Sequence, residues 1–366
     1  MKENINIDTK TFIRFWLVVI GFGLVGLSIY VALPALMIIG MALFLAIALN
    51  PSVSKISNLL PSKSRLLSTA IAYVVVLSVL GTLLFLVIPP IIEQTSKFAQ
   101  NVPSLIDSAT TQYSGISDFV DRYDLRPQYN EVVVSLKSNA TKFASGIGTN
   151  LISGIGSIVS VFANTILVLV LTFLMLVEGP TWINRLWSLY KNKEKMANHR
   201  SNVHKMYSVV TGYIAGQLTV SAIDGFFAGL TVFILSLILG VPANLTIPTV
   251  AIMFVMSLIP FFGAILGAAF ITLVMAINNP LAAIILLIYF VVYQQIENNF
   301  IAPRIQSKKL DLSPLIILIS IVVGLVLFGI AGGIISIPIA GCIKILVDNY
   351  FVRSKAKETT DIKSVI

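Results

Sequence analysis

The sequence predicts an all-α integral membrane protein that crosses the bilayer several times, with about eight hydrophobic segments of roughly membrane-spanning length. Composition is the first observation behind this prediction, because 57% of the 366 residues are hydrophobic and 11% are charged, against roughly 45–50% and about 25% in soluble domains. The second is that apolar stretches of about 20 residues, enough for a helix to cross a ~30 Å bilayer core, recur along the whole chain.

The apolar segments follow one another with short polar connections. The first begins near the N-terminus and lacks a small-x-small cleavage site, so we expect it to remain in the protein rather than to be removed as a signal peptide. A turn at Pro34 is predicted to divide it into two crossings. The predicted segments are residues 15–33, 35–49, 66–92, 151–177, 207–239, 245–277, 281–301 and 314–347.

Two of these segments carry helix-breaking residues near their centres. Segment 245–277 is interrupted by IPFFG at 259–263, and segment 314–347 by GIAGG at 329–333. Each break leaves pieces of about 14 to 18 residues, at or below the length that spans comfortably. Proline and glycine weaken a helix interior. Both segments are therefore predicted to be re-entrant helical hairpins, which enter the membrane and return to the same side.

The distribution of Lys and Arg predicts the orientation. Five basic clusters, at residues 2–14, 55–65, 185–205, 304–309 and 344–363, hold 20 of the 25 basic residues. By the positive-inside rule, these clusters and both termini are expected in the cytoplasm, with residues 93–150 on the far side. That polar stretch shows helical apolar spacing over 105–120 and 129–144, which predicts an amphipathic insert that acts as a cap or a subunit contact.

An inverted repeat is the prediction for the C-terminal half. Residues 207–277 form a polar-striped helix followed by a broken hairpin, and residues 281–347 repeat this order in the opposite direction across the membrane. Paired broken segments of this kind indicate the binding site of a secondary transporter. The expected domains are N-terminal transmembrane helices (1–92), the extracytoplasmic insert (93–150), a transmembrane helix with a basic loop (151–206), the transport core (207–347) and a cytoplasmic tail (348–366).

Both long helices of the core contain a carboxylate. An acid deep in a membrane helix costs about 2.5–3.5 kcal/mol or more, so it normally faces a partner, a cavity or an ion path. Asp224 shares a helix face with Ser221 and Gln217. The predicted substrate- or ion-binding residues are Asp224, Glu297, Gln217, Ser221, Gln294, Gln295, Tyr293 and Arg304, and the hairpin-tip residues are Pro260, Phe261, Phe262, Gly263, Gly329, Gly332 and Gly333.

Each acid also has a purely structural interpretation. Glu297 could form an ion pair with Arg304, seven residues later, and Asp224 could hydrogen-bond a neighbouring helix in its protonated form. The glycines spaced four apart on the first helix, such as Gly225 and Gly229, are typical of close helix packing. His199 and His204 lack partners at ligand spacing, so no metal site or other cofactor is expected apart from a coupling proton or Na⁺.

The C-terminal motifs resemble those of a known family. ILGVPANL (238–245), LIPFFGAILG (258–267), QQIENNFIAPRI (294–305), LSPL (312–315) and GIAGGIISIPIAG (329–341) are similar to motifs of the autoinducer-2 exporter family of bacterial permeases. The resemblance is specific from residue 239 onward and looser before it. The chain departs from the family at Phe261, where Tyr is frequent, and at Ser313, where His is frequent, which puts a shared substrate in doubt but not the fold.

The resemblance implies a bacterial inner-membrane protein that forms homo-oligomers, with a pentamer as one expected form. Some members are taken to export the quorum-sensing signal autoinducer-2, and others are described as sodium/proton antiporters. The positions carried over from the family motifs are Pro260, Gly263, Gln295, Glu297, Pro303, Pro314, Gly329, Gly332, Gly333 and Pro338.

The functional hypothesis is a secondary transporter that exports a small polar solute, such as an autoinducer-2-like signal, using a proton or sodium gradient. One alternative is a monovalent cation/proton antiporter. Another is a membrane scaffold that transports nothing and binds a partner through the insert. The expected partners are the lipid bilayer, the solute and further copies of the chain, with no nucleic acid and no enzymatic role.

Overall fold

The computed structural model describes residues 9–61, 63–112, 122–123, 126–127, 130–132, 134–135, 138–139, 142, 155–305 and 312–365. Over these residues the secondary structure is helical, with no strand. Six of the helices in this part of the chain are long and apolar enough to cross a membrane, and two shorter apolar helices accompany them. The protein is therefore an all-α, multi-pass membrane protein, as its composition predicts.

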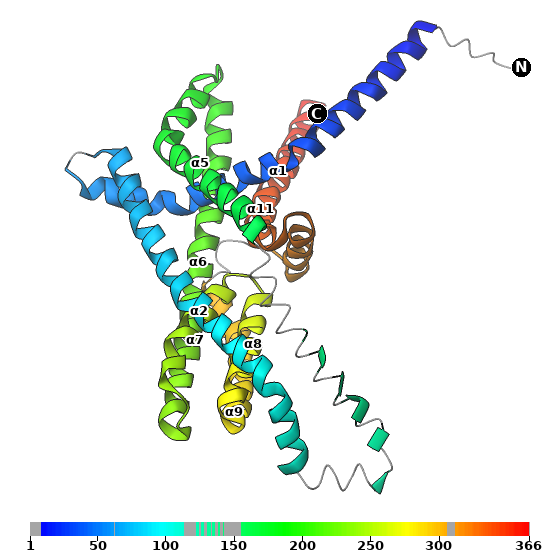
Figure 1. The fold of residues 1–366 in the computed structure, drawn as a ribbon. Coiled ribbons are helices and arrows are strands. Elements are labelled where there is room, and N and C mark those ends of the chain that lie inside the picture. Colours follow the sequence, from blue (N-terminus) through cyan, green and yellow to red (C-terminus); the bar gives the residue numbers. More distant parts are fainter. Residues whose placement is uncertain are drawn as a thin grey trace, which may run out of the picture.

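The N-terminal helix differs from its prediction. Helix α1 runs from Thr9 to Leu59 without interruption and contains both Pro34 and Pro51, so the predicted turn at Pro34 is absent. Proline removes its own N–H and crowds the carbonyl four residues earlier, and membrane helices tolerate it where neighbouring groups satisfy the freed carbonyl. At 1.5 Å per residue α1 is about 75 Å long. Figure 1 shows its first part extending away from the other helices, and most of its side chains up to residue 40 are exposed.

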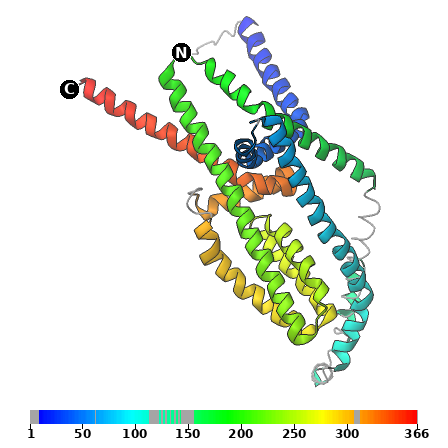
Figure 2. The same ribbon diagram turned by 90° about the vertical axis from the view of Figure 1, so that its left-hand side faces the viewer.

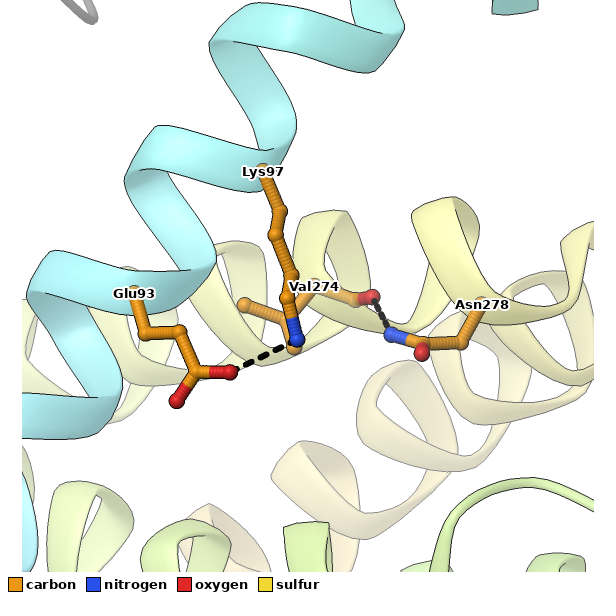
Figure 3. A network of polar contacts seen from close by, with 4 residues as sticks. All are labelled: Glu93, Lys97, Val274 and Asn278. Carbon is orange, nitrogen blue, oxygen red and sulfur yellow. Dashed lines mark hydrogen bonds and ion pairs between the residues drawn. The ribbon is translucent and has the colours of Figure 1, made fainter.

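Helices α2 (Arg65–Gln112) and α5 (Ile155–Ser188) pack beside the second part of α1. Ala46, Val53, Ala72 and Leu176 form their shared apolar core. Helix α2 continues well past residue 92, where its membrane segment was expected to end. It contacts α8 (Phe262–Asn278), and Figure 3 shows its Glu93–Lys97 ion pair with Val274 and Asn278 of α8. Half of the residues in the predicted amphipathic helices at 105–120 and 129–144 lie outside the described residues, and residues 105–112 belong to α2.

A hydrogen-bond network centred on Arg65 joins four helices. Pro180 lies inside α5 and has no N–H to donate to the carbonyl of Leu176, four residues earlier. Arg65 Nε at the start of α2 donates to that carbonyl instead, at 2.7 Å. Arg65 Nη2 also donates to Asn50 Oδ1 on α1. Asn50 Nδ2 in turn donates to the Tyr207 hydroxyl on α6 (Lys193–Leu239) at 2.8 Å. The network therefore ties the start of α2 to internal positions of α1, α5 and α6.

This network gives a double-mutant prediction. Arg65→Met leaves the Leu176 carbonyl without a donor, and we expect it to lower the free energy of unfolding by about 1–3 kcal/mol. Pro180→Ala restores an N–H within α5, so Arg65→Met should cost less in the Pro180→Ala background. Thermal unfolding of the four purified proteins measures this coupling. An equal cost in both backgrounds would show that the carbonyl of Leu176 does not depend on Arg65.

The first half of the predicted repeat begins with helix α6 (Lys193–Leu239). Asn192 caps its start by accepting from the N–H groups of Glu194 and Lys195, and Gly240 ends it in the left-handed conformation. The second half begins with α9 (Pro280–Ile296), which continues into the π-helical turn η2 (Glu297–Ile301). Figures 1 and 2 show that α6 and α9 run in opposite directions, as the inverted repeat requires.

The predicted break at 259–263 is present as a helix–turn–helix. After the short helix η1 (Ala243–Leu245), α7 (Thr246–Ser257) and α8 (Phe262–Asn278) pack against each other, and Phe261 in the turn has a φ of 65°. Helix α7 has 12 residues, which give only about 18 Å and cannot cross a ~30 Å bilayer core. This segment, the first hairpin, is a helical hairpin, and its insertion into the membrane remains a prediction.

Close packing against α6 holds the first hairpin in place. A Cβ added to Gly229 would lie 2.1 Å from Val250 Cγ2, and one added to Gly225 would lie 2.7 Å from the Val250 carbonyl oxygen. Only glycine lets α6 and α7 approach this closely, which explains the glycine spacing in the sequence.

The second break lies within α11 (Pro314–Val365). The backbone leaves the helical conformation at Phe328 and at Gly329, where φ is 60° and ψ is −153°, a region that essentially only glycine occupies. A Cβ on Gly324 would lie 2.4 Å from the Gly332 carbonyl oxygen, so the two arms of this second hairpin fold back into contact. The start of α1 and the end of α11 lie on the side of the molecule opposite the end of α2 (Figure 1).

Candidate functional site

Asp224 lies on the face of α6 that contacts α7 and α9. Its side chain is buried, with 1% exposed. The Tyr293 hydroxyl on α9 donates to Asp224 Oδ1 at 2.8 Å. The other oxygen, Oδ2, accepts no hydrogen bond among the described residues, although the side chain of Ser257 lies beside the carboxylate. One carboxylate oxygen is thus buried and available for a proton, a cation or a solute.

Glu297 lies one turn beyond Tyr293, at the start of η2. It is 8% exposed, and Gln294 Nε2 donates to its Oε2 at 3.1 Å. It is close enough to Asp224 for the two side chains to interact electrostatically. The N–H of Ala302 donates to the Glu297 carbonyl, five residues back, which is the π-helical pattern that often occurs at functional sites. Pro303 follows directly and does not fit the interior of a regular α-helix.

Gln217 connects α6 to the turn of the first hairpin. Its Nε2 donates to the carbonyl of Ser257, the last residue of α7, at 2.6 Å. This carbonyl is one of the last in α7, and the last four carbonyls of a helix have no N–H partner within the helix. One turn further along α6, Ser221 is completely buried and its hydroxyl has no partner in the described structure.

Aromatic rings pack around Tyr293, the hydrogen-bond donor to Asp224. Tyr289 stacks on Tyr293 with 5.6 Å between the ring centroids, and Phe227 lies 5.9 Å from the Tyr293 ring. Phe227 and Ser257 were not predicted as site residues. Ser257 stands just before the break at 259–263, so its position in the sequence could have indicated a site residue. Phe227 is one of many apolar residues in its helix, and nothing in the sequence distinguishes it.

Two predicted site residues lie apart from Asp224 and Glu297. Gln295 is exposed, and its backbone carbonyl accepts from Asn299 Nδ2. Arg304 is also exposed, and no ion pair with Glu297 forms. The structural interpretation of Glu297 as a partner of Arg304 therefore has no support in this conformation.

The hairpin tips are more closely packed than the sequence suggested. Pro260 and Gly263 are buried, Phe261 and Phe262 are exposed, and the N–H groups of residues 262 and 263 bond within the turn. Gly329 is exposed, while Gly332 and Gly333 are buried between the arms of the second hairpin. The two hairpins belong to separate hydrophobic clusters. A binding site lined by both tips therefore stays a prediction.

Helix α6 is the element that both hairpins share. Its C-terminal half packs on the first hairpin through Gly225 and Gly229, whereas Tyr213 packs with Ile321 and Ile337 of the second hairpin. The face that carries Tyr213, Gln217, Ser221 and Asp224 thus contacts both, as the spacing of these residues predicts. The resulting cluster, defined here as the acidic cluster, consists of Gln217, Ser221, Asp224, Ser257, Tyr293, Gln294 and Glu297.

Tyr293→Phe tests the central hydrogen bond of this cluster. The substitution removes the donor to Asp224 Oδ1 and keeps the ring stack, so we expect a loss of about 1–3 kcal/mol in the free energy of unfolding. Tyr289→Phe is the matched control, because the Tyr289 hydroxyl makes no hydrogen bond of good geometry in the described structure, although the side chain of Thr231 lies beside it. Thermal unfolding in detergent measures both. Equal effects would contradict a stabilising role for the Tyr293–Asp224 bond.

The sequence was compared with families of known proteins. Residues 17–352 match the model that describes AI-2E family transporters. The chain belongs to the AI-2E family. The match covers nearly the whole chain and confirms the resemblance seen in the C-terminal motifs.

Individual relatives agree with the AI-2E assignment. The candidate transport protein YueF of Bacillus subtilis (strain 168) is 25% identical over 303 residues, which cover 81% of this chain and 78% of YueF. YrrI of the same strain, also named as a candidate transport protein, is 24% identical over 80% of each chain. The AI-2 transport protein TqsA of Escherichia coli (strain K12) is 23% identical over 84% of each chain.

Proposed function

We propose that this AI-2E family protein is a secondary transporter that exports a small polar solute and uses a proton or sodium gradient. The observation that carries this proposal is Asp224, a fully buried carboxylate at the contact of two antiparallel membrane helices, with Oδ2 free of hydrogen bonds.

The energetics of this carboxylate support ion coupling. A charge at membrane depth is costly unless it is paired or hydrogen-bonded. In the described structure Asp224 has no Lys or Arg partner, and Glu297, which interacts with it electrostatically, has the same sign. Binding of H⁺ or Na⁺ would relieve this repulsion. The ion would thus stabilise one packing of α6, α7 and α9, and its release would favour another.

The arrangement of the helices supports transport rather than a static role. Two antiparallel helices, each followed by a broken hairpin, match the architecture in which solute and coupling ion bind at the interface of inverted repeats. The amide and hydroxyl groups of Gln294, Ser221 and Ser257 provide hydrogen bonds that an ion alone does not require. They suit an uncharged polar solute, and the name of TqsA makes AI-2 the first compound to test.

Flux into proteoliposomes tests this function. The purified full-length chain is reconstituted, a proton or sodium gradient is imposed, and uptake of AI-2 and related polyols is measured against protein-free liposomes. We expect uptake that depends on one of the gradients. Gradient-independent background flux for every solute would overturn the exporter proposal, and a phenotype in cells that survives without any flux would favour the scaffold.

A cation/proton antiporter is the second candidate. Carboxylate and hydroxyl oxygens are the ligands that hard cations prefer, and Asp224 Oδ2, Ser221 Oγ and Ser257 Oγ are all buried without a hydrogen-bond partner in the described structure. An antiporter would change the internal pH of vesicles when Na⁺ is added, with no organic solute present. A pH change without AI-2 flux would decide for the antiporter.

We also propose a bacterial inner-membrane location with both termini in the cytoplasm and a homo-oligomeric assembly. The basic clusters and the common side of the start of α1 and the end of α11 support this orientation (Figure 1). The long exposed apolar surface of α1 is available to lipid or to another copy of the chain.

A further inference from the structure

A cavity of about 590 Å³ lies between α1, α5, α6 and the start of α2, apart from the acidic cluster. Its walls are largely apolar and include Leu43, Ile47, Leu171, Leu174 and Ile183. The polar side chains of Asn50, Arg65, Glu178 and Tyr207 also line it. The cavity therefore combines a hydrocarbon-like wall with two opposite charges.

Among the described residues, neither charge has an ionic partner. There Arg65 donates to two neutral acceptors, the Leu176 carbonyl and Asn50 Oδ1. Glu178 accepts from Trp182 Nε1 at 3.1 Å. Glu178 is exposed and lines the same cavity as Arg65, and no ion pair joins the two side chains in the described structure. A guanidinium and a carboxylate that line one cavity without pairing match a ligand that carries both a negative and a positive group.

The rim of the cavity has the composition of a membrane interface. Trp182 is 56% exposed, and Arg185 lies over its ring with 5.7 Å between the guanidinium carbon and the ring centroid. Tryptophan and basic residues are enriched where a membrane helix meets the headgroups. The apolar walls belong to the hydrophobic parts of α1 and α5. The polar side chains of the cavity thus lie at the depth in the bilayer where phospholipid headgroups are found.

We propose that this cavity binds phosphatidylethanolamine. The lipid phosphate lies at Arg65, the lipid ammonium group lies at Glu178, and an acyl chain lies along the apolar walls. Pockets with basic side chains between membrane helices bind lipid headgroups. Glu178 disfavours a purely anionic lipid. It favours an ammonium group with N–H donors over a choline, which has none. The apolar walls favour a lipid over a water-soluble zwitterion. This inference does not depend on the transported solute.

Lipid-induced stabilisation tests the proposal. The full-length protein is purified, delipidated in detergent and melted with added phosphatidylethanolamine, phosphatidylcholine or phosphatidylglycerol of identical acyl chains. We expect the largest increase in Tm from phosphatidylethanolamine. Glu178→Gln should reduce that increase to the level of phosphatidylcholine and leave the phosphatidylglycerol effect unchanged or larger. Asp348→Asn, an exposed acid outside the cavity, is the charge-matched control and should behave like wild type.

Native mass spectrometry from mixed-lipid nanodiscs gives a second readout. We expect one phosphatidylethanolamine to be retained per wild-type chain and lost in both Glu178→Gln and Arg65→Gln. Arg65→Gln also weakens the helix network, so its lipid-induced shift in Tm is compared with its own lipid-free value. Equal stabilisation by all three lipids, or a preference for phosphatidylglycerol in wild type, would overturn the proposal.

Discussion

Asp224→Asn should reduce gradient-driven solute flux in proteoliposomes to the background of protein-free liposomes. Asparagine has nearly the same shape and keeps an oxygen to accept from the Tyr293 hydroxyl, which donates to Asp224 Oδ1 at 2.8 Å. It cannot take up a proton, and it lacks the negative charge that would bind Na⁺. The packing of α6 against α7 and α9 should therefore survive while the coupling is lost.

Stability and a second acid provide the controls for this experiment. The melting temperature of Asp224→Asn should stay at or above the wild-type value, since the substitution removes a buried ionisable group and its repulsion with Glu297. Asp348→Asn, at an exposed position on α11, should transport like wild type. If Asp224→Asn retained full gradient-dependent flux, Asp224 would not be the coupling residue, and the structural interpretation of a hydrogen-bonded acid would stand.

Gly263→Ala should be the most destabilising single substitution in the first hairpin. A Cβ at this position would lie 1.7 Å from the Met256 carbonyl oxygen. Because the obstacle is backbone rather than a flexible side chain, α7 and α8 must separate. We expect a loss of about 3 kcal/mol in the free energy of unfolding, the upper end for overpacking, and loss of transport because the Ser257 carbonyl would no longer meet Gln217.

Gly81→Ala is the matched control for the hairpin. Gly81 also lies in a membrane helix, and an added Cβ would meet nothing within 4 Å, so the same chemical change should leave the Tm unchanged or raise it slightly. Thermal unfolding in detergent and flux in proteoliposomes are measured for both variants. A Gly263→Ala protein as stable as Gly81→Ala would show that α7 and α8 do not pack as closely as described.

The hairpins could be predicted because their cause is local. Each break gathers several helix-weakening residues in one short stretch, IPFFG at 259–263 and GIAGG at 329–333, and the pieces on either side are too short to span. The α6 face could also be predicted, since Gln217, Ser221 and Asp224 follow regular helical spacing. Asp224 and Tyr293 were both predicted as site residues, but their hydrogen bond depends on how α6 and α9 pack, which helical spacing alone does not determine.

The misplaced residues have equally physical causes. In a regular α-helix Glu297 and Arg304 would share a face at i and i+7, which made an ion pair plausible. The π-helical turn from Glu297 to Ile301 changes the register by one residue, so Arg304 lies exposed instead. Pro34 was predicted to end a helix, but a proline in a membrane helix costs little when its neighbours keep the helical conformation, and α1 continues through it.

The burial of Asp224 has an electrical consequence. With 1% of its side chain exposed, no ion can reach this acid from either compartment unless α6, α7 and α9 first separate. Molecules held in the described conformation should therefore not discharge a voltage across a planar bilayer. A steady current through the purified protein would have to come from a different arrangement of the same helices.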